Sequence, residues 1–173
     1  MKTTGMVRRV DSLGRIVIPK EIRKVLKIKE NEKVEINVSG DEIVLNRYSD
    51  LSEFDESLKV LFDIISSIYK VDILLTDLNV FNLTTKDYMY LEHKEISPYL
   101  SNVLDERLDV LEKNKISISL SNSVDDVERS FLIKTLIVNG DSVGLIIFLS
   151  DDITSIDPNL IELVYKYLEK KLE

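Results

Sequence analysis

The sequence is notable first for what it lacks. It has no cysteine, one histidine, five glycines and three prolines among 173 residues. The lack of cysteine excludes disulfides, thiolate metal sites and cysteine nucleophiles. The one histidine, His93, lies in a polar stretch, which is typical of a surface residue rather than a catalytic one. Gly14, Gly40 and Gly140 fall at expected turns, and neither a Walker nor a Rossmann glycine pattern is present.

Long apolar runs are also missing. The longest, Val143 to Leu149, is far shorter than the ~20 residues that span a bilayer, so we expect no membrane partner. The first residues, Met1 to Gly5, lack the apolar stretch of a signal peptide, which predicts a cytoplasmic location. The carboxylate pairs Asp125-Asp126 and Asp151-Asp152 lack the spacing of a calcium loop. We therefore expect no metal site, no cofactor and no catalytic residues, and so no enzyme.

Charge divides the chain into two parts. Residues 1–50 hold eleven Lys/Arg and eight Asp/Glu, a net charge of +3, whereas residues 51–173 hold twelve and twenty-three, a net charge of -11. The two values add up to the -8 of the whole chain. Such asymmetry predicts two modules with different partners, so we place one domain at 1–50 and the other at 51–173.

The positive charge is densest between Arg8 and Lys27, where seven of twenty residues are Lys or Arg. Only Asp11 and Glu21 in this stretch are acidic. A basic block inside an acidic protein favours a polyanion partner, because clustered cations neutralise phosphates and release counterions. A solvated basic surface without a partner is the alternative that composition leaves open.

The basic block also carries structural signals. Two β-branched runs, at 6–11 and 15–18, flank a stretch with turn chemistry at 11–14, which begins with Asp and ends with Gly. Pro19 then marks the start of a short helix, because its missing N–H would be unpaired there in any case. Three apolar residues at helical spacing should pack inward and leave the basic side exposed. These residues are Ile22, Val25 and Leu26.

A second hairpin completes the first domain. Apolar and polar residues alternate over 34–38, a loop follows at 39–41, and 43–45 is the return strand. The domain is thus expected to be ββαββ in about 50 residues, which buries little apolar surface. We expect it to dimerise, and strand exchange between two copies would build one shared core.

The residues from Thr4 to Lys24 resemble the AbrB-type DNA-binding domain of spore-forming bacteria. The resemblance is carried by the core Leu-Gly-Arg-Ile-Val-Ile-Pro-Lys at residues 13–20 and extends over residues 1–50. It implies a swapped-hairpin β-barrel dimer that binds double-stranded DNA through arginines on one face. It also implies a regulator of transcription, in sporulation or forespore gene expression.

The resemblance implies DNA contacts at Arg8, Arg15, Arg23 and Lys24. At the last of these the family usually has arginine, so Lys24 keeps the charge but loses the bidentate fork. The basic block adds two further candidates. The full candidate set is Arg8, Arg9, Arg15, Lys20, Arg23 and Lys24.

The second domain reads as α/β with an antiparallel sheet flanked by helices. Family members with a second domain of this size have a GAF-like one, and the order of elements here is compatible with that fold. One stretch, 86–94, has no clear pattern. We expect helices at 53–69, 98–113 and from 158 onward, with strands at 71–75, 80–83, 116–120, 131–138 and 143–149.

Two functions remain in view. One is a DNA-binding regulator; the other is an antitoxin that binds DNA and a toxin. The patterned second domain favours the regulator, because antitoxins of this fold usually end in an extended tail. We also expect a homotetramer, joined through the apolar stripes at 54–69 and 160–168. A small-molecule ligand would lie between the sheet and 84–95, near Tyr88 and Tyr90.

Overall fold

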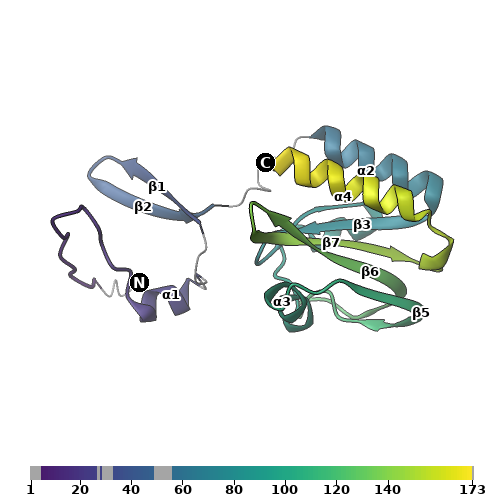
Figure 1. Ribbon diagram of the computed structural model, residues 1–173. Coiled ribbons are helices and arrows are strands. Elements are labelled where there is room, and N and C mark those ends of the chain that lie inside the picture. Colours follow the sequence, from purple (N-terminus) through teal and green to yellow (C-terminus); the bar gives the residue numbers. More distant parts are fainter. Residues whose placement is uncertain (1–4, 27, 29–32, 49–55, 173) are drawn as a thin grey trace. The chain divides into compact units, whose positions relative to one another are not determined.

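The computed structural model describes residues 5–26, 28, 33–48 and 56–172 (Figure 1). The chain divides into two compact units, Met1–Tyr48 and Ser49–Glu173. We call them the N-terminal unit and the C-terminal unit and describe each by itself. The expected start of the second domain's first helix, at 53–55, lies outside the described residues.

The N-terminal unit contains one helix and one hairpin among its described residues. Helix α1 (Lys20–Val25) follows Pro19, and strands β1 (Val34–Ser39) and β2 (Glu42–Arg47) pair antiparallel. The hairpin turns at Gly40, whose φ of +61° is a left-handed conformation that glycine adopts without strain. The predicted helix and the predicted hairpin are therefore confirmed.

The two strands predicted at 6–11 and 15–18 are not formed in this chain. Only the turn between them is present, where the Gly14 N–H donates to the Asp11 carbonyl at 3.0 Å and the Asp11 N–H to the Arg15 carbonyl at 3.1 Å. No further ladder bond joins these two described runs. Strands need a neighbour for their backbone groups, and a single copy offers none beyond the turn.

The predicted packing of α1 is also wrong for a single copy. Ile22 is half-buried, whereas Val25 is 80% exposed and Leu26 is exposed as well. Among the described residues of this unit only Pro19 is buried. In that described part the unit therefore lacks a core of its own. The exposed large apolar side chains are Met6, Val7, Val10, Leu13, Ile16, Val17, Val25, Leu26, Ile36, Val38, Ile43, Val44, Leu45 and Tyr48.

The C-terminal unit is built on a five-stranded sheet in the order β4-β3-β7-β6-β5, with every neighbouring pair antiparallel. This confirms the predicted antiparallel sheet and the predicted order of helices and strands. The helices are α2 (Glu56–Tyr69), α3 (Pro98–Asp105) and α4 (Pro158–Leu172), with short 3-10 helices η1 (Lys86–Leu91) and η2 (Ile153–Ser155). The strands are β3 (Val71–Thr76), β4 (Phe81–Thr84), β5 (Val110–Ile118), β6 (Val127–Val138) and β7 (Asp141–Ser150).

The sheet is covered on both faces. Helices α2 and α4 pack on one face and α3 with η1 on the other (Figure 1). The side chains of β7 alternate between the two faces. Ile146 and Phe148 pack in the core under α2 and α4, whereas Leu145, Ile147 and Leu149 pack in the core under α3 and η1. A strand that is buried on both faces has no polar side, so its sequence is one continuous apolar run.

One helix boundary was predicted wrongly. Helix α3 ends at Asp105 rather than near residue 113, and β5 begins at Val110. Arg107 stops the helix with a φ of +54°, and the Leu108 N–H donates back to the Val103 carbonyl at 2.9 Å. This is the bonding of a Schellman cap, in which glycine is usual. Leu108 and Leu111, which fall within the predicted helix but beyond its observed end, are exposed.

Candidate nucleic-acid interface

All six candidate side chains are exposed and come from three short segments of the N-terminal unit. Arg8 and Arg9 precede the turn at 11–14, and Arg15 follows it. The other three lie on α1 at spacings of three and four residues, which places them on one side of the helix. These are Lys20, Arg23 and Lys24.

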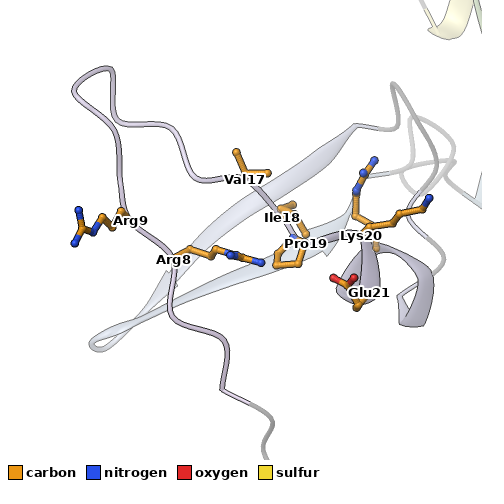
Figure 2. A pocket seen from close by; sticks show the side chains of 8 residues that line it. Arg8, Arg9, Val17, Ile18, Pro19, Lys20 and Glu21 are labelled. Carbon is orange, nitrogen blue, oxygen red and sulfur yellow. The ribbon is translucent and has the colours of Figure 1, made fainter.

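Four of the six side chains surround one open pocket (Figure 2). Arg8, Arg9, Lys20 and Arg23 line it, and its volume is about 530 Å³. In Figure 2 the Arg8 side chain extends toward Pro19, whereas that of Arg9 points away from it. Arg15 and Lys24 lie outside the lining. The remaining lining residues are Val17, Ile18, Pro19 and Glu21.

The pocket therefore combines an apolar wall with four cations and one carboxylate. In the described part of the chain, none of the four cations makes an ion pair. Their charge is not neutralised by those residues and adds to a positive potential at this surface. Such a surface attracts an anion, and Arg side chains can hold phosphate oxygens bidentately.

Arg15 differs from the other five, because it is held by Asp11. Its Nε donates to Asp11 Oδ2 at 2.7 Å, and its backbone N–H donates to Asp11 Oδ1 at 2.8 Å. The Leu13 N–H donates to the same Oδ1 at 2.9 Å. These bonds from Arg15, backbone first and guanidinium second, lower the pKa of Asp11. Sequence reasoning used Asp11 only as a turn residue, although an acid four residues before an arginine was a visible signal.

In the C-terminal unit, polar side chains gather at the start of η1, where Thr85 is the N-cap residue. Asp72 Oδ1 accepts from Thr85 Oγ1 at 2.9 Å, and burial raises the pKa of Asp72. Burial also raises the pKa of Tyr88 to about 12. Tyr88 is buried and Tyr90 exposed, with their ring centroids 6.0 Å apart. His93 is exposed, which confirms the surface position expected for it.

Neither a metal-binding cluster nor a helix that could cross a membrane is found among the described residues. These residues contain no group of three or more His, Cys, Asp or Glu side chains placed to hold a metal ion. None of their helices has the length and apolar character needed to cross a membrane.

Comparison with known proteins gives the family. A family model described as "Antidote-toxin recognition MazE, bacterial antitoxin" matches residues 7–50. Stage V sporulation protein T of Bacillus subtilis (strain 168) is 35% identical over 180 residues, covering 100% of this chain and 99% of that protein. This chain belongs to the stage V sporulation protein T family.

Two shorter relatives, also from Bacillus subtilis (strain 168), match only the N-terminal part of this chain. The transition state regulatory protein AbrB is 52% identical over 48 residues, 28% of this chain and 50% of that protein. The putative transition state regulator Abh is 50% identical over 48 residues, 28% of this chain and 52% of that protein. The N-terminal unit is therefore AbrB-like, which confirms the resemblance carried by residues 13–20.

Proposed function

We propose that this chain is a DNA-binding transcription regulator that works in the cytoplasm on sporulation or forespore genes. Residues 1–50 form its DNA-binding domain and residues 51–173 its assembly and sensing domain. The observation that carries the proposal is the pocket in which Arg8, Arg9, Lys20 and Arg23 gather with no ion-pair partner among the described residues. The names of the relatives, a sporulation protein and a transition state regulator, support the biological setting.

The distribution of the cations favours an extended polyanion over a small anion. A small anion is held by donors that converge in one enclosed site. Here the pocket is open, and Arg15 and Lys24 add charge outside it. Double-stranded DNA presents phosphates along its length, and contacts of this kind position the protein without reading sequence directly. The six DNA contacts are Arg8, Arg9, Arg15, Lys20, Arg23 and Lys24.

A second copy completes the N-terminal unit. Val7 is 93% exposed and Val17 is 77% exposed, and the other large apolar side chains named above for this unit are uncovered in the same way. A surface so rich in apolar side chains requires a covering partner. The runs at 6–11 and 15–18 lack strand neighbours among the described residues, and two copies can supply them to each other. We therefore retain the swapped-hairpin β-barrel dimer.

The C-terminal unit assembles the dimers. Its GAF-like fold is supported by the antiparallel sheet with helices on both faces. Helix α2 exposes Ile64 and Ile68, and α4 exposes Leu163 and Tyr167, beside the faces that they bury against the sheet. These edges are suited to helix pairing between copies, which gives a homotetramer. A small molecule near η1 would make the same unit a sensor.

A toxin-binding antitoxin is the second candidate, because the family model that matches residues 7–50 describes antitoxins. A toxin-binding tail is extended until it meets its toxin. The C-terminal unit instead has buried apolar cores on both faces of its sheet. The full-length match to a sporulation protein also favours the regulator.

The test is a salt titration of DNA binding by fluorescence anisotropy. Each neutralised phosphate adds about 0.9 to the slope of log affinity against log salt. Arg23→Ala, which removes one cation from each copy of the dimer, should weaken binding at least several-fold and lower the slope by up to about 2. Lys113→Ala is the control, because this exposed lysine lies on β5 of the C-terminal unit. Affinity that is independent of salt, or equal effects of the two variants, would contradict the proposal.

A further inference from the structure

We propose that Asp11 is a positioning residue that presents Arg15 to DNA, an inference that rests on the proposed function. Its carboxylate has two roles, one for each oxygen. Oδ1 accepts from the backbone N–H groups of Leu13 and Arg15 and closes the turn. Oδ2 accepts from Arg15 Nε and fixes the direction of the side chain.

The geometry leaves the binding end of the arginine available. A guanidinium carries five N–H donors, of which Asp11 uses the one on Nε. Within the described part of the chain, Nη1 and Nη2 of Arg15 make no hydrogen bond, and the side chain is 72% exposed. These two nitrogens form the fork that binds phosphate or a base edge bidentately.

Positioning matters because an arginine loses rotamer freedom when it binds. If Asp11 already holds the side chain in the unbound protein, part of that entropy loss has occurred before DNA arrives. As an exposed ion pair, the contact adds little to folding stability. Its effect should therefore appear in DNA affinity and not in the melting temperature.

The inference predicts an effect opposite to simple electrostatics. Removing a negative charge beside a polyanion site should strengthen binding if charge alone matters. Asp11→Asn should instead weaken binding about three- to tenfold, because the arginine loses its orientation. Asparagine keeps an acceptor oxygen for the turn but places an amide nitrogen, which cannot accept from Nε, at the other position.

The experiment is a double-mutant cycle on the full chain. Affinity for a labelled duplex about three helical turns long is measured for wild type, Asp11→Asn, Arg15→Ala and the double variant. Positioning predicts that Asp11→Asn weakens binding in wild type but causes no loss in the Arg15→Ala background. Asp41→Asn is the matched control, because it makes the same exchange at an exposed acid of the same unit, in the turn between β1 and β2 and outside the pocket lining, so it should bind as wild type or slightly more tightly.

The outcomes distinguish failure of the proposed DNA-binding function from failure of the proposed role of Asp11. Wild type that binds no duplex refutes the proposed function itself. If wild type binds, then unchanged or tighter binding by Asp11→Asn overturns the role of Asp11. An equal loss in both backgrounds also overturns that role, since Asp11 would then act only on the turn. Normal binding by Arg15→Ala overturns the inference as well, because Asp11 would have no contact to position.

Discussion

Replacing Gly144 by alanine should disrupt the centre of the C-terminal sheet. Gly144 lies on β7, which pairs with β3 on one side and β6 on the other. A Cβ atom at this position would overlap the backbone carbonyl oxygen of Thr76 and come within 3.1 Å of Asp77 Cα. A backbone carbonyl cannot rotate away as a flexible side chain can. Strands β3 and β7 would therefore have to separate.

The magnitude follows from what the separation breaks. The Leu145 N–H donates to Thr76 Oγ1 at 3.1 Å, and both residues are fully buried. A buried donor left without its acceptor costs about 1–3 kcal/mol. Forcing extra volume into a packed core costs a further 1–3 kcal/mol or so. We expect Gly144→Ala to lower the free energy of unfolding by roughly 3–5 kcal/mol, among the largest effects of a single methyl group.

Urea unfolding followed by circular dichroism measures this effect at a fixed protein concentration. Gly140→Ala is the matched control, because it has open space around it but a φ of +87°. Backbone strain alone should cost it roughly 1 kcal/mol. If Gly144→Ala were no more destabilising than Gly140→Ala, the close approach of β3 to β7 would not constrain this position.

Two further predictions concern pH and assembly. Burial favours the neutral form of Asp72 and so raises the pKa of its carboxyl in the folded state. The neutral carboxyl stabilises the fold at pH values below its pKa in the unfolded chain. This stabilisation is lost as the pH rises through the raised pKa of the folded state. Asp72→Asn, which keeps an acceptor for Thr85, should therefore gain on the order of 1 kcal/mol or less at pH 7 relative to wild type, and this gain should vanish below about pH 3 in thermal melts. Light scattering should give the mass of a dimer or tetramer at micromolar concentration, and a clean monomer would refute the shared core.

Sequence patterns predicted the C-terminal unit well where the pattern was local. The hairpin between β6 and β7 turns at Asn139 and Gly140, both with positive φ, as that dipeptide favours. The Ser97-Pro98 start of α3 was equally readable, since Ser97 Oγ accepts from the Leu100 N–H at 3.2 Å. The end of α3 was not, because Arg107 takes the cap position that glycine usually marks. Nor was the role of Gly144, because only tertiary packing brings Thr76 against it.

Four candidate contacts, Arg8, Arg15, Arg23 and Lys24, were implied by the resemblance to the AbrB-type domain. The dense run of cations, which needs no tertiary information, added the other two. What the sequence could not show is which of them come together. Arg8 and Arg23 line one pocket although fifteen positions separate them, and Arg15 lies outside it although it is nearer to Arg8 in the sequence. Residue spacing specifies one side of a helix such as α1 but not the path of the irregular segment before it. The role of Asp11 was missed for a similar reason: it depends on which donor each carboxylate oxygen accepts.

The C-terminal unit has a buried core within one copy and the described part of the N-terminal unit does not, so the two units should differ in how their folding depends on association. The C-terminal unit buries apolar residues on both faces of its sheet within one copy, so it can fold before it associates. The N-terminal unit buries only Pro19 among its described residues, and the runs that carry Arg8 and Arg15 form no strand there. A core completed only by association makes folding depend on concentration. Copies joined through the C-terminal unit would raise the effective concentration of their N-terminal units. Assembly would then promote DNA binding without the acidic C-terminal unit touching the phosphates.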